Sequence, residues 1–177
     1  MKTRVQNISR LVELRRLSDF ESDKGLVLTL TSLIEATIQE IIGAFLVPNA
    51  ASKRYMESTS TAPIKRRVQL TCSLGLISEL EMNVINMLCV IRNQFAHKWN
   101  VTFDTTEVSE KVKELGNLWF KFDGESNQKF NQLTKRETFD KIAFMLLTDL
   151  VHRAEEVSRH RLTPMQWSTT WQKKMDV

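Results

Sequence analysis

Residues that interrupt regular structure are scarce in this chain: its 177 residues include three prolines and five glycines. Most of them lie between segments with helical periodicity, which favours long helices over a β-sandwich with many turns. With 42% hydrophobic and 26% charged residues the composition is that of an ordinary globular protein, which argues against intrinsic disorder and membrane embedding. At this length one buried core is the default, so we expect a single domain over residues 1–177.

Cysteine and histidine are also rare, with two and three copies. Cys72 and Cys89 lie inside apolar helical patterns without Cys-x-x-Cys spacing, so we expect buried free thiols and neither a disulfide framework nor a zinc site. His152 and His160 have no partner at ligand spacing and are interpreted as surface or helix-end residues. The sequence therefore predicts no metal ion and no cofactor, and its free thiols fit a reducing compartment.

A long uninterrupted apolar run is missing as well. The first twenty residues carry five basic side chains and no continuous apolar stretch, so no secretory signal is expected. The most apolar stretch, residues 26–47, is interrupted by polar residues that include Glu35 and Glu40, which argues against a membrane span. We therefore expect a cytoplasmic protein that does not bind membranes.

Charge is nearly balanced, with 25 basic and 21 acidic residues for a net +4, but it is unevenly distributed. Basic residues gather in one region and acidic residues follow in another: Lys53, Arg54, Lys65, Arg66 and Arg67 against Asp104, Glu107, Glu110 and Glu114. The basic cluster is a candidate surface for nucleic acid or for an acidic partner. A solvated helix face explains the same residues equally well.

The spacing of apolar residues predicts an all-α, single-domain helical bundle of about five to six helices. We expect helices over residues 3–18, 22–48, 63–75, 79–95, 104–116 and 135–160. Residues 49–62 and 117–133 lack periodicity and are predicted to be loops. Residues 163–177 form a peripheral tail in which Trp167 and Trp171 could clasp the body or a second subunit.

Several helix ends carry recognisable signals. Ser22 is a predicted N-cap, and Pro63 suits the first position of a helix. Ser78-x-x-Glu81 and Thr134-x-x-Glu137 match capping boxes, in which each end of the motif binds the backbone of the other. Gly75 is expected to adopt the left-handed conformation that ends a helix. Asp104 to Glu107 offers similar cap chemistry.

Four sequence blocks occur in an order and approximate spacing that resemble the mannitol operon repressor family: Ala62-Pro63, Leu74-Gly75-Leu76-Ile77-Ser78, Ile91-Arg92-Asn93-Gln94-Phe95-Ala96-His97 and Thr102-Phe103-Asp104. The resemblance is strongest over residues 62–108 and weak after Gly116. It implies an all-helical, usually dimeric intracellular regulator without a dedicated DNA-reading module. We therefore expect a homodimer that regulates transcription through a protein partner, whereas recognition of mannitol does not follow.

The block from Arg92 to His97 also resembles the R-x(4–6)-H signature of HEPN domains, which include metal-independent endoribonucleases of toxin–antitoxin and phage-defence systems. His97 could move the proton of an RNA 2′-hydroxyl, Arg92 could fork onto two phosphate oxygens, and Asn93 supplies the polar residue after the arginine. Residues five apart on a continuous helix do not share a face. A ribonuclease would therefore need the helix to end or twist at Ala96, or two subunits to share the roles.

Three further interpretations accompany these. His97 and Lys98 could simply terminate a helix while Arg92 holds a carboxylate such as Glu35 or Glu40. The helical body could act only as a scaffold or antitoxin-like module. A helix-turn-helix over residues 64–95 is rejected, because its reading end carries Glu79 and Glu81. We therefore expect weak nonspecific DNA binding at most, and RNA as a partner only if the ribonuclease interpretation holds.

Overall fold

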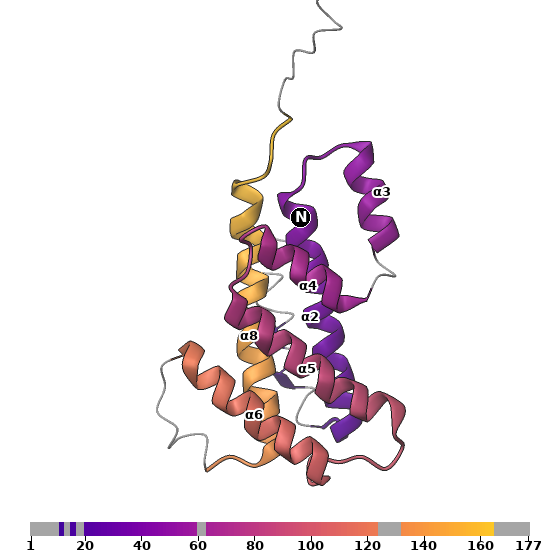
Figure 1. Ribbon diagram of the computed structural model, residues 1–177, viewed down its shortest axis with the longest axis vertical. Helices are drawn as coiled ribbons and strands as arrows, with labels where there is room; N and C mark the ends of the chain where they lie inside the picture. Colours follow the sequence, from indigo (N-terminus) through magenta and orange to yellow (C-terminus); the bar gives the residue numbers. More distant parts are fainter. Residues whose placement is uncertain (1–10, 13–14, 17–19, 60–62, 124–131, 165–177) are drawn as a thin grey trace, which may run out of the picture.

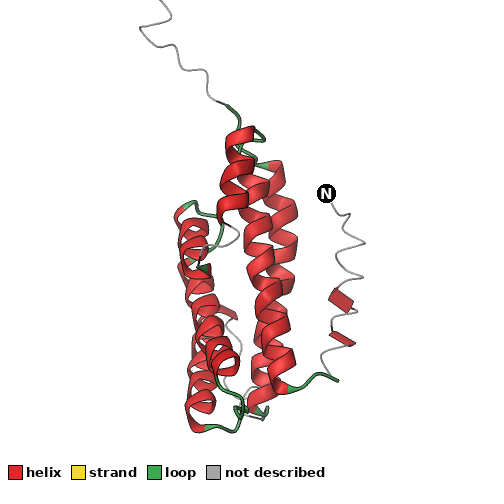
Figure 2. Ribbon diagram, turned by 90° about the vertical axis from the view of Figure 1, so that its right-hand side faces the viewer, coloured by secondary structure: helices red, strands yellow, loops and turns green. Residues whose placement is uncertain are grey.

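The computed structural model describes residues 11–12, 15–16, 20–59, 63–123 and 132–164. These residues form an all-helical bundle without strands, which confirms the predicted fold class (Figure 1). The helices are α2 (Asp23–Phe45), α3 (Ala50–Thr59), α4 (Ile64–Ser73), α5 (Glu79–His97), α6 (Thr106–Asp123) and α8 (Lys135–Arg159). The long α2 and α8 pack side by side as one layer, and α4, α5 and α6 cover it as a second layer (Figure 2).

Helix α2 is the central element, as its apolar periodicity predicts. The Ser22 side chain caps it by accepting a hydrogen bond from the Gly25 N–H at 3.0 Å. By length and hydropathy it is the one helix in the described part of the chain that could cross a membrane. Half of its most apolar stretch, however, is buried within the bundle. Its buried face points to α8 and α5, which is the environment that an apolar core helix requires.

The core is filled by apolar side chains from both layers. Fully buried members with 0% exposure include Ile38, Val84, Ile91, Phe95 and Leu146. A chain of tilted aromatic contacts links Phe95 on α5 to Phe103 at 5.2 Å and Phe103 to Phe139 on α8 at 5.5 Å between ring centroids. These contacts anchor the C-terminal end of α5, where the ribonuclease-like signature lies.

The predicted loop over residues 49–62 is wrong, because helix α3 occupies most of it. The side chain of Asn49 accepts a hydrogen bond from the Ser52 N–H at 2.9 Å and so begins the helix. Gln39 of α2 donates to the backbone carbonyl of Met56 at 2.9 Å. α3 has too few apolar residues to produce a periodic pattern in the sequence. Its contact with α2 becomes apparent only in the structure.

The predicted end of a helix at Gly116 is also wrong, because α6 continues to Asp123 and includes part of the predicted loop 117–133. Gly116 lies inside the helix, where a Cβ would come within 3.8 Å of Thr138 on α8. Gly75 has a positive φ of +70°, as predicted. The two glycines have different roles: one permits a left-handed turn and the other lies where two helices meet.

Smaller differences concern helix starts. Pro63 is the residue before α4 and not its first helical position. α6 begins at Thr106, after Thr105 accepts a hydrogen bond from the Thr102 N–H at 3.1 Å. Both predicted capping boxes, at Ser78 and Thr134, are confirmed. Helix boundaries depend on a few local hydrogen bonds, so shifts of this size are ordinary.

At the N-terminus, residues 11, 12, 15 and 16 are helical, and Leu11 is buried. Arg15 forms an ion pair with Asp140 on α8 and lies 5.4 Å from the centroid of the Phe144 ring. The predicted first helix is thus docked on the core where it is described. The rest of that helix, and Trp167 and Trp171 of the tail, lie outside the described residues.

Candidate functional site

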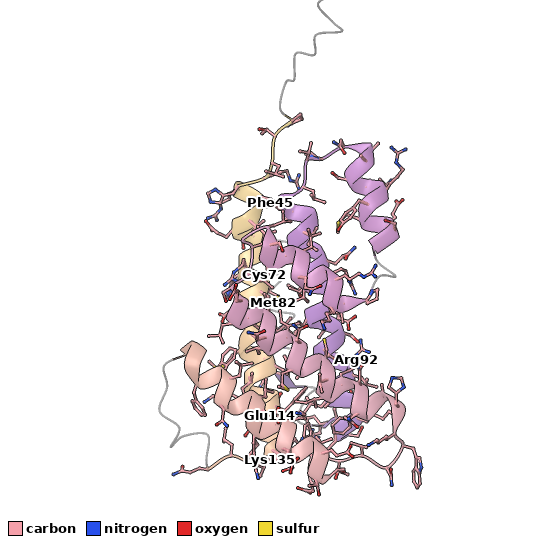
Figure 3. All side chains as sticks on the ribbon, in the orientation of Figure 1. Phe45, Cys72, Met82, Arg92, Glu114 and Lys135 are labelled. Atoms are coloured by element: carbon pink, nitrogen blue, oxygen red, sulfur yellow. The ribbon has the colours of Figure 1, made fainter. Side chains whose placement is uncertain are left out.

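Arg92 lies on the side of α5 that faces α2 (Figure 3). Its guanidinium forms an ion pair with Glu35 of α2 through Nη2, and its Nη1 donates to the Asn93 side-chain oxygen at 3.1 Å. Glu35 was one of the two carboxylates predicted for this arginine. Arg92 is therefore half-buried and paired with a carboxylate of the neighbouring helix.

A second arginine shares the same carboxylate. Arg67 of α4 lies 3.5 Å from Glu35 through Nη2 and donates to Gln39 through Nη1 at 3.2 Å. Gln39 in turn donates to the backbone of Met56 on α3. We call Glu35, Gln39, Arg67 and Arg92 the central ion cluster; it joins α2, α3, α4 and α5 and contains two cations and one anion.

Arg67 was predicted to belong to the surface basic cluster, and this is wrong. Only 9% of its side chain is exposed, and it points toward α2. The reason is its position on α4, where residues 67, 68 and 71 form the buried face. Arg67 follows Lys65 and Arg66 in the sequence and was therefore grouped with them. Neighbouring residues on a helix point in different directions, so Arg67 faces inward while the other two are exposed.

Cys89 lies in the same electrostatic environment. Burial raises the pKa of its thiol to about 11, and the negative charge of Glu35 adds to this, whereas Arg92 and Arg67 act in the opposite direction. Cys89 and Cys72 are free thiols, as predicted. Both are half-buried, whereas the sequence predicts full burial. A thiol that stays protonated at neutral pH is a poor nucleophile, so Cys89 does not suit covalent catalysis.

His97 is the last residue of α5 and is exposed. The helix is unbroken through Ala96, so the break or twist that a ribonuclease within one chain would need is absent from α5. At about 100° per residue, side chains five positions apart point about 140° away from each other around the helix axis. Arg92 and His97 of one chain are therefore not brought together, while Asn93 and His97 lie on one exposed face.

The other four residues of the predicted basic surface are exposed. Lys53 and Arg54 lie on α3, and Lys65 and Arg66 lie in the first turn of α4. No ion pair joins any of the four to a carboxylate within the described ranges. We call these four residues the basic face; the central ion cluster holds its two helices against α2.

A second ion pair with a buried member, Glu81–Arg153, does not follow from the sequence pattern. Glu81 has only 2% of its side chain exposed and accepts hydrogen bonds from the Ser78 backbone at 2.7 Å and from Arg153 of α8 at 2.7 Å. Arg153 also donates to the Leu76 carbonyl at 3.4 Å. The available signal was its position: Arg153 falls between Leu150 and Val157 on an apolar face, where an arginine usually requires a buried carboxylate.

Within the part of the chain that the structure describes, no group of three His, Cys, Asp or Glu side chains is arranged to hold a metal ion. His152 and His160 are exposed, and His160 caps the end of α8, as predicted. No protein-family model, no curated protein and no solved structure matches this chain. The resemblance to mannitol operon repressors therefore rests on the four sequence blocks and stays a prediction.

Proposed function

We propose that this protein is a regulator without catalytic activity of its own, similar in role to mannitol operon repressors, which acts in the cytoplasm by binding an acidic protein partner. The observation that carries the proposal is the ion pair of Arg92 with Glu35. A metal-independent ribonuclease needs a guanidinium directed at phosphate and a histidine beside the attacking hydroxyl. Here both terminal nitrogens of the Arg92 guanidinium are engaged: Nη2 donates to Glu35 and Nη1 donates to Asn93.

The basic face supports binding to an acidic partner. Lys53, Arg54, Lys65 and Arg66 present four cations from two adjacent helices that the central ion cluster fixes in place. Charges of one sign on a rigid surface accelerate association and select a partner of opposite sign. A protein is favoured over DNA because α5 offers Glu79 at the end that a recognition helix would insert into the groove.

The resemblance adds the expectation of a homodimer. A twofold dimer would present two basic faces, and so could hold a symmetric partner by two contacts at once. Light scattering should therefore give twice the chain mass at tens of micromolar, a range in which a biologically useful dimer is assembled.

The second candidate function is a ribonuclease whose site is shared between two copies. The observation in its favour is that Asn93 and His97 are exposed on one face of α5 and so remain accessible to a second chain. Arg92 would then have to leave Glu35. Cleavage of RNA by the purified protein decides between the two functions.

We expect purified protein to leave single-stranded RNA intact in EDTA. Arg92→Lys should lower the melting temperature, because an ammonium replaces the guanidinium fork that holds Glu35 and Asn93 together. His97→Ala should leave it nearly unchanged, since His97 is an exposed helix-end residue. One result would overturn the proposal: the wild type cleaves RNA to products that end in cyclic phosphates, and His97→Ala abolishes this cleavage while the chain stays folded.

The partner is tested by cross-linking in the source cell. Lys53→Glu combined with Arg54→Glu reverses half of the basic face, and Lys113→Glu combined with Lys24→Glu makes the same change in net charge at exposed positions elsewhere. An acidic protein recovered with wild type and with the control, but not with the basic-face variant, is the expected result. Recovery of DNA or RNA in the same pattern would show that the basic face binds nucleic acid instead.

A further inference from the structure

A groove of about 750 Å³ opens where the turn between α4 and α5 meets the C-terminal ends of α2 and α8. Its apolar wall includes Phe45, which Figure 3 labels, together with Leu74, Ile77 and Val157. Its polar residues include Glu81 and Arg153. An apolar concavity of about 300–1,000 Å³ with a few converging polar groups is typical of small-molecule sites.

Arg153 has hydrogen-bonding capacity to spare. Its Nη1 serves Glu81 and the Leu76 carbonyl, while Nε and Nη2 make no hydrogen bond to any residue that the structure describes. About a third of its side chain is exposed, at 32%. A guanidinium has five N–H donors, and the pair of Nε and Nη2 forms the edge that binds a carboxylate through two parallel hydrogen bonds.

The buried carboxylate of Glu81 fixes that edge in space. Glu81 is itself held by the backbone and the hydroxyl of Ser78, at 2.7 and 3.0 Å, so Arg153 is attached to a rigid helix start. An arginine placed in advance loses little conformational entropy when a ligand binds. The arrangement therefore favours a ligand with a planar anionic group.

The surrounding charges limit that ligand to one negative charge. Glu81 is neutralised by Arg153, and Glu156, which also lines the groove, is paired with Arg159 at 2.7 Å. His160 lies 3.9 Å from Glu156 as well. The lining of the groove holds one arginine and no lysine, so the second anionic group of a more highly charged ligand would find no second guanidinium or ammonium there and would approach Glu156.

We propose that this groove binds a small monocarboxylate with an apolar chain. The carboxylate lies on the Nε–Nη2 edge of Arg153, and the chain packs against Leu74, Ile77 and Val157. The site contacts the ends of α2, α4, α5 and α8, so an occupied groove stabilises the packing of both layers. This inference does not depend on the acidic partner, because the basic face consists of different residues.

The test uses the full-length protein labelled with ¹⁵N and titrated with hexanoate, hexanol and hexylamine in turn. Hexanoate should shift the amide resonances of residues 74–78, and hexanol should bind about tenfold or more weakly, because it lacks the charge that Arg153 recognises. Equal binding of hexanol, tighter binding of hexylamine, or hexanoate shifts centred on the basic face would each overturn the proposal.

Two variants locate the site. Arg153→Lys keeps a cation beside Glu81 but loses the fork, and it should weaken hexanoate binding by about tenfold or more. Leu74→Trp fills the groove and leaves the Glu81–Arg153 ion pair unchanged, so it should also weaken hexanoate binding. This variant tests the location of the site if Arg153→Lys fails to fold. Lys113→Gln, an exposed change on α6, should bind hexanoate like wild type. Undiminished binding by the folded groove variants would refute the assignment.

Discussion

Two groups of charges in this bundle each have one deeply buried member, and they are built in opposite ways. In the central ion cluster the deeply buried member is a cation, Arg67, and its carboxylate Glu35 is shared with Arg92. In the Glu81–Arg153 pair the deeply buried member is the carboxylate, and the arginine reaches water. A charge that cannot reach water depends on its partner, so the two sites should respond oppositely to loss of an acid or a base.

The two sites also differ in what they join. The central ion cluster links four helices through side chains from separate parts of the sequence. The Glu81–Arg153 pair adds one distant arginine to a local capping box. The first site thus connects helices from separate parts of the chain, and the second adds a contact to a helix start that the sequence already specifies.

The largest effect is expected at Glu35. Glu35→Ala leaves Arg67 buried without its anion and two guanidinium groups close together, and should lower the free energy of unfolding by about 3 kcal/mol. Arg67→Met should cost about 1 kcal/mol, because Glu35 keeps Arg92 and the methionine fills the space. Urea denaturation monitored by circular dichroism measures both. A larger loss for Arg67→Met would contradict the assignment of Arg67 as the dependent member.

At the second site the order should reverse. Arg153→Gln leaves the buried Glu81 carboxylate without its counter-charge and should cost about 2 kcal/mol. Glu81→Gln should cost about 1 kcal/mol, because glutamine retains the capping interaction with Ser78 and Arg153 can turn toward water. The same denaturation experiment compares the two. If Glu81→Gln proves the more damaging change, burial of the carboxylate is not what controls this site.

The smallest expected effect concerns the reactivity of the Cys89 thiol and not the stability of the fold. It tests how strongly the charge of Glu35 acts on a neighbouring group. In a Cys72→Ser background, iodoacetamide should alkylate native Cys89 slowly at pH 8, since burial raises the pKa of its thiol to about 11 and Glu35 adds to the shift. Adding Glu35→Gln should lower that pKa, because the negative charge is removed while the two arginines remain. Alkylation rates measured across pH give the pKa, and an unchanged profile would contradict a contribution from Glu35.

The two capping boxes show what sequence can and cannot reveal. Ser78-x-x-Glu81 and Thr134-x-x-Glu137 were both recognised, since each motif is completed within one turn. Glu137 is exposed, and the Thr134 backbone hydrogen bond lowers the pKa of its carboxyl. Glu81 is buried under Arg153, which lies 72 residues away. No local rule distinguishes the two, because burial depends on what another helix places on top.

The candidate site was predictable in part. Glu35 and Glu40 were the two carboxylates suggested for Arg92, and the structure pairs Arg92 with Glu35. The inward direction of Arg67 was not predicted, since it depends on where α4 lies against α2. Arg92, Asn93 and His97 were found together by their spacing, but the distance between functional groups depended on whether α5 continued through Ala96.

By itself the sequence determined the all-α class, the starts of α2, α5 and α8, and the left-handed turn at Gly75, because caps, glycines and apolar periodicity act over a few neighbouring residues. Only the tertiary structure decided that α3 is a helix, that α6 continues through Gly116, and which charged side chains are buried. Those features depend on helices that meet from distant parts of the chain, and packing between such helices outweighs weak local preferences.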